Sequence, residues 1–309
     1  MDITAPRFVD EIAAREHLES LRWPDGPYCP HCGSLNATRL HGEKHRVGAV
    51  QCNDCRQQYT VTVGTVFERS KVPLNKWLLC NHLLCASKKG ISAKQIERML
   101  GVTYKTAWFM CHRIREAMRT DPATAGPLGG KGTFVEADET FIGGKGKNRH
   151  ARNRDNKRGY QGKQVVMTLV ERGGQARSFH VANVTGPMLR DVLVRNVDRA
   201  SVLMTDEHSG YQKVGKEFAF HGTTKHSLGE YVRFGVIHSN TAESFFSIMK
   251  RGVIGTYHHW SAAHLHRYCA EFDFRYNTRL STDFERADAA LIAIEGKRLT
   301  YRRTLQSLA

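Results

Sequence analysis

The chain has 309 residues, 40% hydrophobic and 25% charged, which is enough for two or three globular domains with sizeable cores. Its apolar runs stop well short of the roughly 18–20 residues that a membrane span needs, and the acid-containing start of the chain is unlike a secretory signal. The net charge of +16 predicts a polyanionic partner, with nucleic acid ahead of an acidic membrane surface.

The first segment, residues 1–66, contains two C-x2-C pairs separated by 19 residues: Cys29 and Cys32, then Cys52 and Cys55. Two such pairs can supply the four thiolates of a tetrahedral structural zinc site. The residues after the second pair alternate as strands do, so we expect a zinc ribbon. A redox or disulfide pair is the alternative. The other four cysteines lie among apolar neighbours and indicate buried thiols in a reducing cytoplasm.

The second segment, residues 67–121, has a helical pattern that predicts a helix-turn-helix after an upstream helix at 73–89. Ser92 is a helix start, Gly101 lies in the turn, and Thr103 caps the second helix. A generic helical hairpin is the alternative.

Two sets of residues follow from this second helix. The spacing predicts a core-facing stripe at Ala107, Cys111, Ile114 and Met118. The same spacing points Lys105, Phe109, His112 and Arg113 outward. The candidate DNA contacts of this helix are Lys105, Thr106, His112 and Arg113.

A Pro- and Gly-containing loop (120–132) leads to the third segment, 130–280, which alternates strand and helix signals. We expect a strand at 132–141, a hairpin at 164–184, a helix at 186–197, a strand at 201–211, a helix-prone stretch at 211–219, a strand at 230–238, and helices at 241–252 and 262–276. This order of elements is that of a ribonuclease H-like mixed sheet. A short helix and a basic tail then form a fourth segment, 281–309.

In a ribonuclease H-like sheet the first and fourth strands are neighbours, which would bring Asp138 and Asp206 together. Glu243, on the helix after the last strand, can reach the same place. Clustered carboxylates suit two divalent ions, Mg²⁺ or Mn²⁺, for phosphoryl transfer on DNA. The pattern Asn240-x-x-Glu243 also fits a capping box, so helix capping is the alternative for Glu243. Lys250 lies two helical turns further on and would face the same way.

The loop at 143–163 is rich in Lys and Arg and contains one acid, Asp155. It follows the Asp138 strand directly, so we expect it to hold DNA phosphates near the acids. Its candidate contacts are Lys145, Lys147, Arg149, Arg152, Arg154, Lys157 and Arg158, and Lys250 and Arg251 join them from the helix. For His208, His238, His258 and His259 a hydrogen-bonding role is favoured over proton transfer.

The chain resembles bacterial insertion-sequence transposases of the DDE class, of the ISXO type with an N-terminal zinc ribbon. The stretches that carry the resemblance are RWPDGPYCPHCGS (22–34), VEADETFIGGK (135–145), MTDEHSGY (204–211), HSNTAESFFSIMKRGVIGTYHHWS (238–261) and AEFDFRYNTR (270–279). The resemblance implies Asp138 and Asp206 as metal ligands and Lys250 as a DNA-contacting lysine. For the third ligand it leaves Glu243, which we favour, and Asn240.

The resemblance also implies a function. We expect a protein that binds terminal inverted repeats and catalyses metal-dependent strand cleavage and transfer on double-stranded DNA. It would act as a homodimer or higher oligomer, in the cytoplasm and at the nucleoid. The alternatives are a non-catalytic DNA-binding regulator and a junction-resolving nuclease with the same core.

Overall fold

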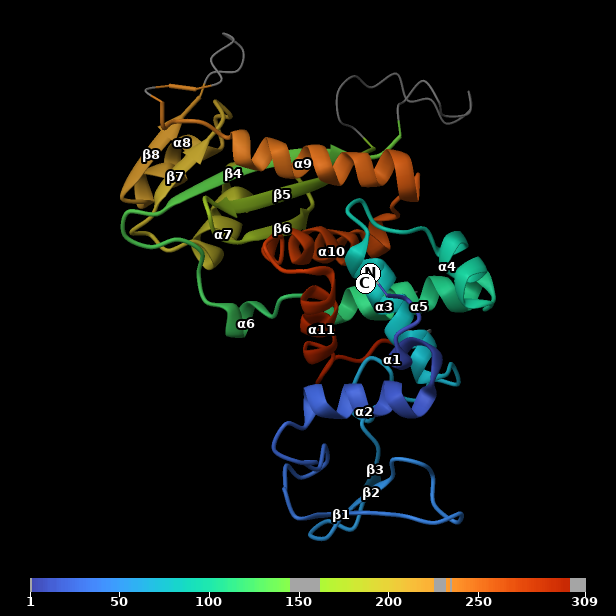
Figure 1. The fold of residues 1–309 in the computed structure, drawn as a ribbon. Coiled ribbons are helices and arrows are strands. Elements are labelled where there is room, and N and C mark those ends of the chain that lie inside the picture. Colours follow the sequence, from blue (N-terminus) through green and yellow to red (C-terminus); the bar gives the residue numbers. More distant parts are fainter. Residues whose placement is uncertain (1, 145–161, 225–231, 234, 301–309) are drawn as a thin grey trace. The chain divides into compact units, whose positions relative to one another are not determined.

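In the computed structural model (Figure 1), the chain divides into two units: residues 1–118 with 280–309, and residues 119–279. The structure describes residues 2–144, 162–224, 232–233 and 235–300. Over these ranges, no helix is both long enough and apolar enough to cross a membrane.

The first unit begins with two helices, continues through the cysteine-rich segment, and ends in further helices. Its elements are α1 (Pro6–Val9), α2 (Glu11–Arg22), β1 (Ala37–Arg39), β2 (Val50–Cys52), β3 (Gln58–Tyr59), α3 (Leu74–Ala86), α4 (Ala93–Leu100), α5 (Tyr104–Ala117) and α11 (Asp283–Ile292). The three strands form an antiparallel sheet in the order β1-β2-β3, as a zinc ribbon requires.

The core of this unit is built around α3, which has buried residues along its whole length. Trp77, Leu78 and Leu84 are almost completely buried. The C-terminal helix α11 packs against α3, where Asn81 Nδ2 donates to the Ala287 carbonyl at 2.8 Å. Residues that are distant in the sequence therefore complete one core.

Helices α4 and α5 form the predicted helical pair. Ser92 and Thr103 cap them, Gly101 adopts the left-handed conformation (φ 60°) between them, and the predicted stripe of α5 is buried. The prediction that His112 and Arg113 point outward is wrong, because they are 0% and 6% exposed. The helix packs against α3, α4 and α11, so more than one of its faces is covered. Arg113 Nε donates to the Leu299 carbonyl at 3.0 Å.

The second unit contains a five-stranded mixed sheet with helices on both faces. Its elements are α6 (Pro122–Ala125), β4 (Phe134–Ile142), β5 (Gln164–Glu171), β6 (Ala176–Val181), α7 (Gly186–Asn196), β7 (Val202–Thr205), α8 (Tyr211–Val214), β8 (Phe220–Thr223), α9 (Asn240–Gly252) and α10 (Leu265–Asn277). The strand order is β6-β5-β4-β7-β8, with β4, β7 and β8 parallel and β5 antiparallel to its neighbours. The predicted ribonuclease H-like arrangement, with the first and fourth strands adjacent, is confirmed.

Alternation along β4 explains why the sheet needs helices on both sides. Val135 and Ala137 belong to a core shared with α7 and α8. Ile142, which has the opposite parity, belongs to a second core with α9 and α10. By the same alternation Glu136 and Asp138 project toward the α9 side of the sheet.

The fifth strand differs from the prediction. It is β8 (Phe220–Thr223), whereas the described residues of 230–238 contain a turn and an isolated bridge between Arg233 and Ile237. The partner strand β7 is only 4 residues long, so a short strand suffices. Three of the four residues of β8, His221, Gly222 and Thr223, are of types common in loops. The sequence pattern therefore favoured the more apolar stretch at 230–238.

Candidate functional site

The geometry of the sheet brings two of the predicted acids together. Strand β4 pairs in parallel with β7, with Glu136 opposite Met204. Continuing this register by two residues places Asp138 opposite Asp206, which follows the last residue of β7. Glu139 joins them, and carboxylate oxygens of the three residues lie within 4.8 Å of one another.

This acidic group fits a divalent metal ion. Two oxygen ligands on opposite sides of a Mg²⁺ ion lie about 4.2 Å apart, because each Mg–O bond is about 2.1 Å. Burial, together with the charges of Asp206 and Asp138, raises the pKa of Glu139 to about 8, against a hydrogen bond from the Tyr211 hydroxyl. A buried carboxylate beside two further carboxylates forms a site that a cation would stabilise.

The third predicted ligand lies on α9. Glu243 is an exposed residue of the first helical turn and is not a member of the three-acid group, and Asn240 is exposed as the first residue of α9. Lys250 and Arg251 are exposed in the last turn. The roles of Glu243, Asn240 and Lys250 stay predictions.

The capping-box alternative for Glu243 is wrong. Helix α9 begins at Asn240, so Asn240 is not the cap, and Ser239 in the capping position makes no side-chain capping bond. The amides of Thr241 and Ala242 instead donate to Glu136 Oε2, at 2.8 and 2.9 Å. A strand residue, 105 positions before Thr241, therefore caps this helix.

Two of the predicted histidines make hydrogen bonds near the acids. His208 Nδ1 accepts from the Gly210 amide, and its own amide donates to Asp206 Oδ1 at 3.0 Å. His238 Nδ1 lies 3.2 Å from Glu136 Oε1. Both positions agree with the predicted hydrogen-bonding role.

The four cysteines of the ribbon form the second candidate metal centre. Their sulfur atoms lie within 4.8 Å of one another, with Cys29–Cys55 and Cys32–Cys52 Sγ distances of 3.6 Å. Sulfurs that share a tetrahedral Zn²⁺ lie about 3.8 Å apart, given Zn–S bonds of about 2.3 Å, whereas a disulfide is about 2.05 Å long. The backbone N–H of Cys55 lowers the pKa of the Cys52 thiol to about 7, which favours the thiolate that zinc binds.

The predicted burial of the remaining thiols is confirmed. These four cysteines are buried and lie outside the ribbon's cluster: Cys80, Cys85, Cys111 and Cys269.

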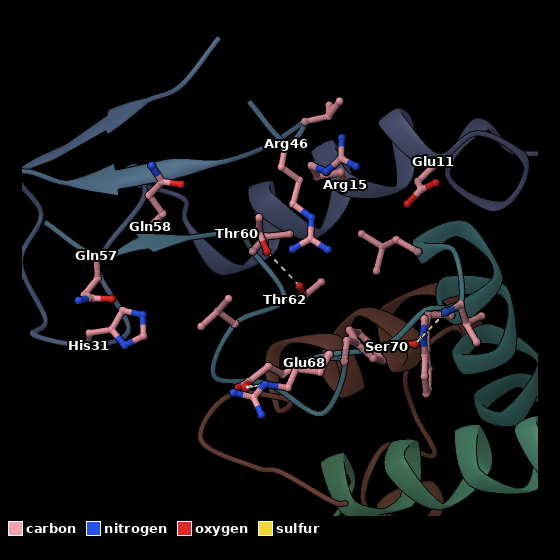
Figure 2. A pocket seen from close by; sticks show the side chains of 18 residues that line it. Glu11, Arg15, His31, Arg46, Gln57, Gln58, Thr60, Thr62, Glu68 and Ser70 are labelled. Atoms are coloured by element: carbon pink, nitrogen blue, oxygen red, sulfur yellow. Dashed lines mark hydrogen bonds and ion pairs between the residues drawn. The ribbon is translucent and has the colours of Figure 1, made fainter. Parts of the chain in front are cut away.

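A polar hollow of about 440 Å³ lies beside the ribbon, between β3, α2 and the segment that leads to α3. Figure 2 shows the guanidinium of Arg46 turned into this hollow, with Arg15 lining it from α2. Arg15 packs over Gly48, where a Cβ would come within 2.3 Å of its side chain. Neither arginine forms an ion pair with a carboxylate within the described part of the chain, so both charges are available to an anionic partner.

The predicted DNA contacts fall into three groups. Lys105 is exposed and Thr106 half-buried at the start of α5, whereas His112 and Arg113 are buried. Lys250 and Arg251 are exposed on α9. The loop residues Lys145, Lys147, Arg149, Arg152, Arg154, Lys157 and Arg158 lie outside the described residues.

Fold and site together define a protein with a zinc-ribbon segment and an acidic centre on a ribonuclease H-like sheet. Residues 127–277 match the family described as the ISXO2-like transposase domain, and residues 9–58 match the transposase zinc-ribbon domain. The chain is 30% identical over 256 residues to an uncharacterised protein in transposable element ISH50 of Halobacterium salinarum, a match that covers 79% of this chain and 83% of the relative. The chain belongs to the ISXO2-like transposase family, which confirms the predicted resemblance.

Two acids near the centre escaped the sequence analysis. Glu139 was passed over because alternation assigns it to the opposite face from Asp138. Glu136 has the same parity along the strand as Asp138, but it was assigned no role. Its signal was present in the sequence, since an acid flanked by Val135 and Ala137 in a buried strand needs partners for its charge.

Proposed function

We propose that the chain binds the terminal inverted repeats of an insertion sequence and catalyses metal-dependent cleavage and transfer of DNA strands. The observation that carries this proposal is the convergence of Asp138 and Glu139, in the middle of β4, with Asp206, which follows the end of the parallel strand β7. Glu243 would complete the ligand set from α9. Divalent ions held there, Mg²⁺ or Mn²⁺, would supply Lewis-acid stabilisation of the attacking and leaving oxygens.

The chain's own residues would position the DNA. Lys250 and Arg251 lie on the same helix as Glu243, so phosphates bound by them would lie beside the acids. In the first unit, Lys105 and the unpaired arginines of the hollow offer further phosphate contacts. Joining two element ends requires two active centres, so we expect a homodimer or higher oligomer on DNA.

The test is cleavage of a duplex that carries an element end, with Mg²⁺, by the full-length protein. We expect the variant Asp206→Asn to lose at least 1,000-fold in cleavage rate while its affinity for the end changes less than threefold. The matched control Asp191→Asn, an exposed residue of α7, should behave as wild type.

Two outcomes would contradict the proposal. Binding without any metal-dependent cleavage would indicate a regulator. Cleavage of branched junctions in preference to element ends would indicate a junction-resolving nuclease.

A further inference from the structure

Glu136 is a completely buried carboxylate surrounded by donors. Its side chain is 0% exposed, and its neighbours on β4, Val135 and Ala137, are buried and apolar. Besides the two α9 amides, the Thr241 hydroxyl donates to its Oε1 at 2.9 Å and Arg172 Nε donates to the same oxygen at 2.6 Å. A buried charge is tolerated only when its lone pairs are satisfied in this way.

These bonds join the two parts of the chain that carry the predicted ligands. Strand β4 carries Glu136 and, two residues further on the same face, Asp138. Helix α9 carries Glu243 immediately after the two amides that Glu136 accepts. The positive end of the helix dipole also favours a carboxylate at this place.

Arg172 extends the connection to the segment before the helix. Its NH1 donates to the Val236 carbonyl at 2.8 Å, and its NH2 donates to the His238 carbonyl at 2.9 Å. The guanidinium also lies 5.0 Å from the ring centroid of Phe134 on β4. Glu136 is thus connected to the first turn of α9 directly, and through Arg172 to the segment that precedes the helix.

We propose that Glu136 is a positioning residue of the active centre, which fixes the start of α9 relative to Asp138 and so sets where Glu243 and Lys250 lie. This inference rests on the proposed function for its catalytic consequence. The amides of Thr241 and Ala242, in the first turn of α9, both donate to Glu136, so this carboxylate connects the first turn to β4.

The variant Glu136→Gln keeps the size of the side chain but replaces one acceptor oxygen by an amide donor, which opposes the amides of α9. We expect amide hydrogen exchange in the first turn of α9 to accelerate at least tenfold in the full-length protein, with the last turn unchanged. At saturating DNA, the Mg²⁺ concentration for half-maximal cleavage should rise at least fivefold. Thr241→Val, which removes only the hydroxyl donor, should shift both quantities less in the same direction and serves if Glu136→Gln does not fold.

The matched control is Asp273→Asn, another buried carboxylate of the same unit, which accepts from Ser178 on β6 and not from α9. A purely structural role of Glu136 would lower the amount of active protein without changing its Mg²⁺ requirement. Unchanged exchange in α9, or a Mg²⁺ requirement within twofold of wild type, would overturn the inference. A wild type without metal-dependent cleavage would instead refute the proposed function, and the exchange comparison alone would then decide whether Glu136 holds α9.

Discussion

Two glutamates three residues apart on β4 occupy opposite electrostatic surroundings. Glu136 has Arg172 and the amino-terminal end of α9 as partners, so its negative charge is matched within the protein. Glu139 has one donor, the Tyr211 hydroxyl, and two acidic neighbours, so burial and like charge raise its pKa to about 8. Glu136 therefore stabilises the structure through its partners, whereas Glu139 would be stabilised by a bound cation.

A third buried acid of this unit predicts a pH effect on stability. Burial raises the pKa of Asp273 to about 7, against two hydrogen bonds from Ser178, while its ordinary value is 3.8. The folded protein therefore binds more protons than the unfolded chain between these values, and the free energy of unfolding falls as the pH rises from about 4 to 7. Relative to the Asp273→Asn variant, the free energy of unfolding of the wild type should fall by about 2–4 kcal/mol over this pH range.

Urea unfolding at a series of pH values measures this difference. Asp191→Asn, which removes an exposed acid, should leave the pH profile of wild type unchanged. Parallel profiles of wild type and Asp273→Asn would show that the Asp273 carboxyl is not shifted in the folded protein.

At the scale of elements, features that follow from the periodicity of the sequence could be predicted, whereas features that depend on contacts with other elements could not. The alternation of β4 and the strand order brought Asp138 and Asp206 together correctly. The strand β8 was missed because its pairing with β7, not its own pattern, makes it a strand. His112 and Arg113 were assigned to an exposed face because part of what covers α5, helix α11 and the Leu299 carbonyl, is distant in the sequence. The capping of α9 by Glu136 depends on a contact that no local pattern contains.

The ribbon is the element with the clearest metal dependence. The variant Cys52→Ser removes one of four sulfurs, so we expect it to lose its zinc and the ordered structure around β1–β3, because a small sheet without its own core depends on the metal. Metal analysis should give one zinc per chain in wild type and none in the variant. Hydrogen exchange should increase in residues 29–59 and stay unchanged in residues 119–279.

Cys85→Ser changes a buried cysteine outside the cluster and should retain one zinc per chain. Zinc retained by Cys52→Ser with an unchanged ribbon would contradict the tetrahedral four-cysteine site.

At the scale of the whole molecule, one unit is continuous in sequence and the other is not. Both cores of the mixed sheet are formed within residues 119–279. The other unit needs α11, because Phe284 lies against His82 and Arg286 donates to the Cys85 carbonyl. The unit that carries the acidic centre is thus an insertion between α5 and α11.

This arrangement predicts different behaviour of two fragments. Residues 119–279 should fold alone and unfold cooperatively on heating. Residues 1–118 alone should be at least about 3 kcal/mol less stable than the same unit in the full chain, because the apolar surface of α3 that α11 covers becomes exposed. Circular dichroism melting curves measure both, and adding a peptide of residues 280–309 should restore part of the loss. A fragment 1–118 as stable with the peptide as without it would contradict the role of α11.

The insertion also delays the folding of the first unit while the polypeptide is being synthesised. Between the synthesis of Met118 and that of Asp283 the ribosome adds 165 residues (283 − 118), which takes roughly 8 to 33 s at about 5–20 residues per second. During this delay α3 is made but its closing helix is not, while the inserted sheet can already assemble. A newly made chain would therefore complete the unit with the acidic centre first, and the unit with the zinc ribbon would be completed only after α11 has been made.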